Sequence, residues 1–96
     1  MKSVIAGLNK VFDSRIRLGI MAVLAVNENL DFNALKEYLE VTDGNLASHL
    51  KALEKEEYIE VKKSFVGRKP NTRYVMTVKG RDAFERHLKG LQSLIR

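Results

Sequence analysis

The sequence predicts a mainly helical fold with one small β-hairpin, an α+β class, in a single domain spanning residues 1–96. Apolar residues recur at spacings of three and four along most of the chain, which is typical of amphipathic helices. One segment, residues 58–78, is instead rich in β-branched and aromatic residues and contains the turn-like stretch GRKPN with the only proline. Ninety-six residues are enough for one modest core, and the absence of cysteine excludes disulfides and thiolate metal sites.

Two helices are expected before residue 27. Over Ser3–Phe12 a single stripe collects Val4, Ile5, Leu8, Val11 and Phe12. Asp13 or Ser14 can then cap a second helix whose apolar residues surround the axis almost completely: Ile16, Leu18, Ile20, Met21, Val23, Leu24 and Val26. A helix that is apolar all round belongs in a core.

A helix pair follows the turn at residues 27–31, where a very short strand at residues 30–32 is an option. Asn33 is expected to cap the third helix, ALKEYLE, with Leu35, Tyr38 and Leu39 facing inward. After Val41, Thr42 caps a fourth helix that runs to about Glu56 and buries the stripe Leu46, Leu50 and Leu53.

Two strands and a last helix complete the chain. The strands are expected at Tyr58–Phe65, with Ile59 and Val61 alternating, and at Arg73–Val78, with Tyr74, Met76 and Val78 alternating. Thr77 can start the last helix, which carries Phe84, Leu88, Leu91, Leu94 and Ile95. The expected layout is therefore a helix pair over about 33–56, a hairpin over about 58–78 and a C-terminal helix over about 78–95. A helix pair joined by about two residues and followed at once by a basic hairpin is the layout of a winged helix-turn-helix.

The exposed face of the fourth helix is unusual for a solvated helix. In place of long charged residues it carries short polar ones that are mostly poor helix formers, and Gly44 lies in its first turn. In a helix-turn-helix this helix enters the major groove with its N-terminal residues at the base edges, so short side chains allow close approach and Asn45, Ser48 and His49 offer hydrogen bonds.

The basic charge is concentrated in the C-terminal part of the chain. Of the net charge of +5, residues 1–56 contribute −1 and residues 57–96 contribute +6. Between Val61 and Arg81 there are seven basic residues and no acidic one, a pattern that attracts polyanions. A basic surface without a partner remains the plainer interpretation of the charge alone. The residues expected to contact DNA are Thr42, Asp43, Gly44, Asn45, Ser48, His49, Lys51, Lys62, Arg68, Lys69, Asn71 and Arg73.

Two stretches, TDGNLASHLKALEKEEYI and GRKPNTRYVMTVKGRDAF, also carry a family resemblance. Over roughly residues 14–90 the sequence resembles the small winged-helix regulators of the MarR/ArsR-like group. The resemblance implies a homodimeric transcription factor with the recognition helix in the major groove and the wing near the minor groove or the phosphates. Asp43 departs from the neutral polar residue that many relatives carry there, and no cysteine pair exists for the metal sensing that some relatives perform.

Several residues have a second interpretation. Asp43 is favoured at a helix N-terminus by the helix dipole as well as being able to read cytosine, and His49 can pack against the third helix instead of contacting DNA. A hydrolase using Ser48 and His49 is rejected because adjacent helix residues do not face each other. No spacing supports a metal site at His49 and His87, and no phosphate-loop pattern surrounds Gly67 and Gly80.

The apolar stripes of the first and last helices exceed what one small core needs. They predict a homodimer interface made of Val4, Ile5, Leu8, Val11, Phe12, Phe84, Leu88, Leu91, Leu94 and Ile95. The expected partners are double-stranded DNA and a second copy, with no cofactor, no membrane and no catalytic activity; a small-molecule effector is possible but not indicated. No signal peptide or membrane-length apolar run is present, so a cytoplasmic protein is expected. The alternative function is a winged helix that binds proteins without reading DNA.

Overall fold

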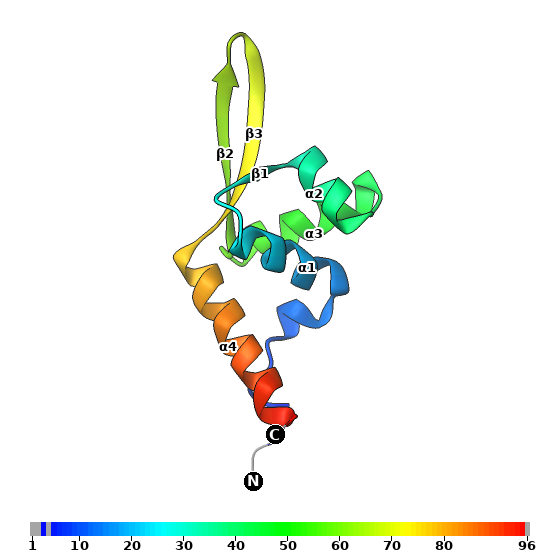
Figure 1. Ribbon diagram of the computed structural model, residues 1–96, viewed down its shortest axis with the longest axis vertical. Coiled ribbons are helices and arrows are strands. Elements are labelled where there is room, and N and C mark those ends of the chain that lie inside the picture. Colours follow the sequence, from blue (N-terminus) through cyan, green and yellow to red (C-terminus); the bar gives the residue numbers. More distant parts are fainter. Residues whose placement is uncertain (1–2, 4, 96) are drawn as a thin grey trace.

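A computed structural model describes residues 3 and 5–95, and its fold is mainly helical with a small antiparallel sheet (Figure 1). The described part of the chain contains a 3-10 helix, four α-helices and three strands. In chain order these are η1 (Lys10–Asp13), α1 (Arg15–Ala25), β1 (Leu30–Asp31), α2 (Phe32–Leu39), α3 (Asp43–Lys55), β2 (Ile59–Val66), β3 (Lys69–Met76) and α4 (Val78–Leu94).

The helix expected over Ser3–Phe12 is wrong in the part that is described. Isolated turns replace it, with Ala6 N–H donating to Ser3 O and Leu8 N–H donating to Ile5 O, both at 3.0 Å. Asn9 has extended backbone angles and caps η1 through its side chain. Its backbone N–H donates to His87 Nδ1 at 3.0 Å, so this group is committed to α4 and cannot continue a helix.

The helix pair has the predicted order with two corrections. Asp31, not Asn33, caps α2, because its carboxylate accepts from Ala34 N–H at 2.8 Å. Tyr38 is 59% exposed, so it does not face inward, whereas Leu35 is fully buried as expected. Glu40 closes α2 in the left-handed conformation (φ 51°), and Thr42 caps α3 as predicted.

The turn of the hairpin is tighter and its second strand is longer than predicted. The three strands lie in the order β1-β3-β2, and β2 pairs with β3 from Ile59 opposite Met76 to Val66 opposite Lys69. Only Gly67 and Arg68 connect them, and Gly67 has the positive φ of 66° that the first central residue of a type II′ turn requires. Pro70 and Asn71, expected in the turn, therefore belong to β3.

One core joins the helices to the base of the hairpin. Its fully buried members come from α1, α2 and α3 and include the predicted stripe of α3; the buried residues are Phe12, Ile20, Met21, Leu24, Leu35, Leu46, Leu50, Leu53, Ile59 and Phe84. Two apolar residues expected inside are not: Val26 is 82% exposed after the end of α1, and Val78 is 80% exposed at the start of α4. The buried apolar stripe of α1 therefore ends before Val26, and that of the hairpin ends before Val78.

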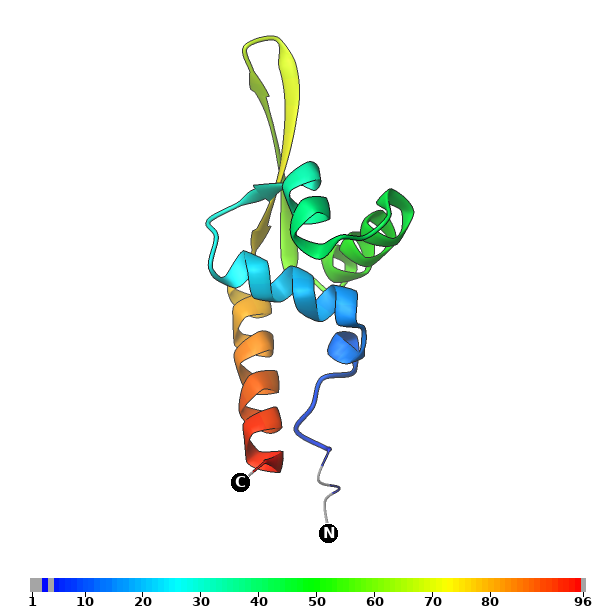
Figure 2. The same cartoon turned by 45° about the vertical axis from the view of Figure 1, so that its right-hand side comes forward.

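The last helix is fixed to the hairpin at its first turn. Thr77 caps α4 as predicted, its Oγ1 accepting from Gly80 N–H at 2.9 Å, while its own N–H donates to Tyr58 O at 3.1 Å. A Cβ on Gly80 would lie 2.0 Å from Tyr58 O, so only glycine allows this approach. The contact orients α4 away from the hairpin, and the Cα atoms of the molecule extend over 58 × 26 × 21 Å (Figures 1 and 2).

Candidate nucleic-acid interface

The N-terminal half of α3 presents its polar side chains to solvent. Thr42 Oγ1 accepts from Asn45 N–H at 3.3 Å and begins the helix, while Leu46 and Leu50 fix the opposite face in the core. Asn45, Ser48 and Lys51 are exposed. Within the described residues, the side chains of these three form no hydrogen bond or ion pair. Their polar groups are therefore available to a partner.

Gly44 has no role inside the fold that another residue could not fill. A Cβ built at this position meets no atom within 4 Å, and the residue lies in regular helix. Glycine here costs helix propensity, up to about 1 kcal/mol against alanine. Packing therefore does not require this glycine, and the absence of a side chain leaves the backbone of α3 open to solvent at this position.

Asp43 forms an ion pair that joins the two helices of the pair. Its carboxylate lies 2.7 Å from Lys36 Nζ of α2, and the side chains of Lys36 and Asp43 are 44% and 70% exposed. The carboxylate also lies in the first turn of α3, where the helix dipole favours negative charge. An exposed pair of this kind contributes about 0–1 kcal/mol. These contacts support the helix-terminus interpretation of Asp43.

His49 is half-buried and contacts Arg17 of α1. Its Nδ1 lies 3.2 Å from Arg17 Nη1, and Arg17 Nε donates to Val11 O at 2.6 Å. Arginine can only donate, so Nδ1 is the acceptor and a neutral ring carries its proton on Nε2. Burial and the Arg17 charge lower the pKa of His49. The sequence analysis missed Arg17; its signal is a basic residue within an otherwise apolar helix.

The outer half of the hairpin, which we call the wing, is basic and exposed. Arg68 in the turn and Lys69 beside it form no ion pair among the described residues, and Lys62 lies 3.5 Å from Glu60. Lys63 is also exposed there and was missed, although it belongs to the basic run that the sequence displays. In Figures 1 and 2 the wing projects from the body at the end occupied by α2 and α3.

Arg73 differs from the other basic residues of the hairpin because the fold uses its guanidinium. Nε donates to Asn29 Oδ1, and Nη1 lies 3.6 Å from the Asp31 carboxylate. Asp31 is the β-register partner of Arg73, so the contact ties β1 to β3. Asn71, nearer the turn, is half-buried opposite Ser64. Arg73 thus has a structural role. It lies at the base of the wing and not at its tip.

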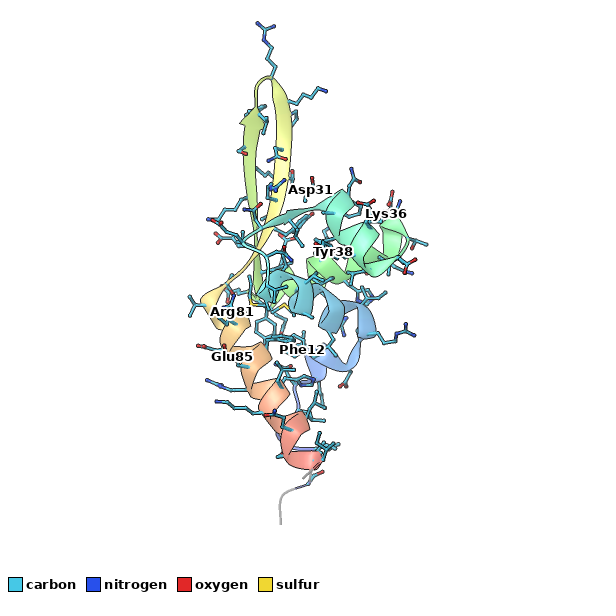
Figure 3. The ribbon with its side chains drawn as sticks, viewed as in Figure 1. Phe12, Asp31, Lys36, Tyr38, Arg81 and Glu85 are labelled. Atoms are coloured by element: carbon cyan, nitrogen blue, oxygen red, sulfur yellow. The ribbon has the colours of Figure 1, made fainter. Side chains whose placement is uncertain are left out.

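The residues predicted to form the homodimer interface differ in how far they are exposed. Phe12, which is labelled in Figure 3, and Phe84 are buried within the chain, where their rings meet edge to face with centroids 6.0 Å apart, so they offer no surface to a partner. Val11 and Leu8 are half-buried, Ile5 is exposed, and Val4 lies outside the described residues. Four residues in or just after α4 are exposed, Leu88, Leu91 and Leu94 to 37–42% and Ile95 to 85%, and they line an open apolar hollow of about 580 Å³.

His87 has a structural role. It is 5% exposed, accepts from Asn9 N–H and packs against the Phe12 ring with centroids 5.1 Å apart. In the part of the chain that is described, no three His, Asp or Glu side chains are grouped to hold a metal ion. None of the helices in the same residues has the length and apolarity that crossing a bilayer requires.

Comparisons with known proteins agree with this geometry. Residues 16–95 match the family model of the winged helix DNA-binding domain. An uncharacterised protein of Methanocaldococcus jannaschii is 44% identical over 79 residues, which are 82% of this chain and 86% of that protein. The structure of a transcriptional regulator homologue from Pyrococcus horikoshii superposes with a TM-score of 0.77 at 31% identity, covering 90% of each chain.

A MarR-family transcriptional regulator from Silicibacter pomeroyi shares the fold, with a TM-score of 0.73 at 17% identity; the match covers 94% of this chain and 60% of that longer one. The winged-helix family expected from the recognition helix and the wing is therefore confirmed. The chain belongs to the family of winged-helix DNA-binding domains.

Proposed function

We propose that this protein is a sequence-specific transcriptional regulator that binds double-stranded DNA as a homodimer. In this proposal α3 lies in the major groove and the wing lies against the minor groove or the phosphates. One observation carries the proposal: the N-terminal half of α3 exposes short, unpaired polar side chains around a glycine that the fold does not require. The Pyrococcus horikoshii relative, described as a transcriptional regulator homologue, supports the same biological role.

Base recognition is assigned to Asn45 and Ser48. These residues lie about one turn apart on α3, and an asparagine amide can pair with adenine in the major groove while a serine hydroxyl suits several bases. The dipole of α3 adds a positive end that favours phosphate nearby. Thr42, Gly44, His49 and Lys51 surround these two residues, and we assign them to backbone approach and phosphate contact.

The homodimer is proposed to form through α4. Its exposed stripe of three leucines and Ile95 lies at the end of the molecule opposite the wing (Figures 1 and 2), so pairing there leaves both recognition helices free. Twofold pairing would let two copies of α3 read half-sites about 34 Å apart, one turn of the duplex. The predicted operator is therefore a palindrome.

A winged helix that only binds proteins is the competing function. Such a module has no need for exposed cations at the hairpin tip, and Arg68, Lys69 and Lys63 are all exposed there. Charge therefore favours the DNA-binding function over this alternative.

The test is selection of bound duplexes from a random library, followed by titration of the selected site and of random DNA. Wild type should prefer the selected site by about 10³-fold or more, on the order expected for specific binding. Asn45→Ala should cost about 1–3 kcal/mol on the selected site and almost nothing on random DNA, because the variant cannot bond to a base but keeps every phosphate contact. Equal weakening on both DNAs would make Asn45 a backbone contact, and failure to enrich any sequence would refute specific recognition.

A further inference from the structure

Arg17 of α1 is a half-buried cation that takes part in no ion pair among the described residues. The fold instead holds its guanidinium at two neutral acceptors. Nε donates to Val11 O of η1 at 2.6 Å, and Nη1 lies 3.2 Å from His49 Nδ1 of α3. Because both contacts come from one planar group, they fix the guanidinium and with it the orientation of the His49 ring.

The other ring nitrogen of His49 is open to solvent. Nε2 forms no hydrogen bond within the described residues, and no side-chain nitrogen or oxygen in that part of the chain is both buried and without a partner. Since Nδ1 accepts from Arg17, the neutral ring carries its proton on Nε2. An oriented N–H donor is therefore available to a partner outside the chain.

This donor lies next to the side chains that were assigned to base recognition. His49 follows Asn45 by about one helical turn and is adjacent to Ser48, so its ring lies on the flank of the polar face of α3. A side chain on the flank of a recognition helix faces the walls of the major groove, where the phosphates lie.

The charges around His49 keep its ring neutral. From α1, Arg17 faces the ring, and burial together with the Arg17 charge lowers the pKa of His49 from the ordinary 6.5. The ion pairs of the described residues include neither Arg17 nor His49. The α3 residues one turn away from His49 carry no charge: Asn45, Leu46, Ala52 and Leu53.

Histidine at position 49 meets two needs that a carboxylate would not. If this position served only to hold Arg17, aspartate or glutamate would do so more strongly, because a bond between charged groups is stronger than one to a neutral acceptor. A carboxylate would also place negative charge beside the phosphates. The imidazole accepts from Arg17 on one side and donates on the other. Holding Arg17 therefore does not by itself explain the histidine.

We propose that Arg17 is a positioning residue of the DNA interface, which holds His49 so that its Nε2–H donates to a phosphate oxygen of the duplex. The inference rests on the proposed DNA-binding function and assigns the orientation of one of its phosphate contacts to a residue of α1. Because the ring is uncharged, this contact adds affinity without adding to the salt dependence of binding.

Nitrogen NMR of the two histidine rings tests the tautomer in the free protein. Above pH 6.5, His49 should carry its proton on Nε2, and His49→Gln identifies its signals by removing them. Arg17→Met should move the ring toward the tautomer mixture of a free imidazole and raise its pKa toward 6.5. His87, whose Nδ1 accepts from Asn9 N–H, is the internal control and should keep its tautomer.

Two NMR results would overturn the inference. One is a wild-type His49 that carries its proton on Nδ1, which needs no variant to observe. The other is an Arg17→Met protein in which the tautomer and the pKa of His49 are those of the wild type.

Binding measurements above pH 6.5 connect the ring to DNA. His49→Leu should weaken binding to the selected site and to random DNA alike, about tenfold, and leave the slope of log K against log salt unchanged, because no charge is lost. His49→Gln should restore most of the affinity, because its side-chain amide also has an acceptor for Arg17 and an N–H for the phosphate. Wild-type affinity in His49→Leu, or a loss confined to the selected site, would contradict a phosphate contact.

Variants of Arg17 separate positioning from charge. Arg17→Lys keeps the charge but lacks the planar group that reaches both Val11 O and His49, so it should bind DNA as weakly as Arg17→Met. Arg15→Met removes the same charge from an exposed position on α1 and is the matched control, which should keep the wild-type affinity. Wild-type affinity in Arg17→Lys would show that only the charge of Arg17 matters and would refute positioning.

The pH profile of binding gives a further readout that loss of packing alone would not change. In Arg17→Met the ring should take up a proton at higher pH than in the wild type, and the new charge attracts phosphate. Binding by this variant should therefore strengthen more steeply than that of the wild type as the pH falls through 6.5. Parallel pH profiles would refute the inference while duplex binding persists, whereas a wild-type protein that binds no duplex would refute the proposed function itself.

Discussion

At Gly44, a substitution is expected to have opposite effects on the stability of the fold and on DNA binding. The open space around its Cα means that a methyl group is harmless to packing, and alanine is the better helix former. Gly44→Ala should therefore raise the free energy of unfolding by up to about 1 kcal/mol, measured by urea denaturation, and weaken DNA binding.

Gly44→Glu extends this test to charge. A carboxylate in the first turn of α3 is favoured by the helix dipole, so this variant should also stay folded. Its negative charge should nevertheless abolish binding to specific and random DNA together. If Gly44→Ala stabilises the protein without weakening the complex, close backbone approach at this position is not part of recognition.

His49 makes stability depend on pH. Its pKa in the folded chain is lowered from the ordinary 6.5 by burial and by Arg17, so between these two values the unfolded chain binds more protons. The free energy of unfolding should therefore fall as the pH drops from above 6.5 through the folded pKa of His49.

The measurement is urea unfolding at a series of pH values for wild type and for His49→Gln. The variant should lack this component of the pH dependence and keep the rest. Identical pH dependence in the two proteins would show that the contact with Arg17 does not perturb His49.

At the scale of elements, substitutions in the wing test whether its basic side chains contact DNA phosphates. Arg68→Ala with Lys69→Ala should weaken binding to all sequences alike and reduce the salt slope by about 1 for each phosphate that is no longer neutralised. Replacing Arg86 and Lys89 of α4 by alanine removes the same net charge from exposed positions outside the wing. This control should keep the wild-type slope; if the two double variants behave alike, only net charge matters and the wing makes no specific contact.

The base of the wing is joined to the body through Arg73. Arg73 bonds to Asn29 and lies near Asp31, both in the segment between α1 and α2, so the base of the hairpin is tied to the start of the helix pair. We expect this contact to help fix the direction of the wing relative to α3. We therefore assign Arg73 to positioning, and not to the DNA surface on which its charge alone would place it.

At the scale of the whole molecule, the exposed stripe of α4 predicts the assembly state. Leu88→Glu with Leu91→Glu should convert a dimer into a monomer, measured by sedimentation, and weaken binding to a palindromic site because the second half-site is no longer linked. Val78→Glu, also on α4 but outside the stripe, is the matched control and should remain dimeric.

A further single variant keeps this prediction testable if the double variant unfolds. Ile95→Glu changes a side chain that is 85% exposed, so it should weaken the dimer without a decrease in helix content by circular dichroism. A wild-type protein that sediments as a monomer at micromolar concentration would exclude assembly through α4 at that concentration.

The sequence by itself determined the elements whose signals are local. Ser14, Thr42 and Thr77 each accept a hydrogen bond from the backbone three residues later, and the α3 stripe of Leu46, Leu50 and Leu53 is buried. Caps and periodic stripes involve neighbours in the chain, so sequence order is enough to predict them. The exposed short polar residues of α3 followed from the same periodicity.

Tertiary structure decided everything that depends on a distant partner. The N-terminal stripe did not become a helix because Asn9 bonds to His87, 78 residues away. Arg17 became the neighbour of His49, and Arg73, which the sequence predicted only as a DNA contact, also bonds to Asn29. The pattern of residue types shows which polar groups need hydrogen-bond partners. Which partner each group finds depends on how the helices and strands pack, and this cannot be predicted from the spacing of residues along the chain.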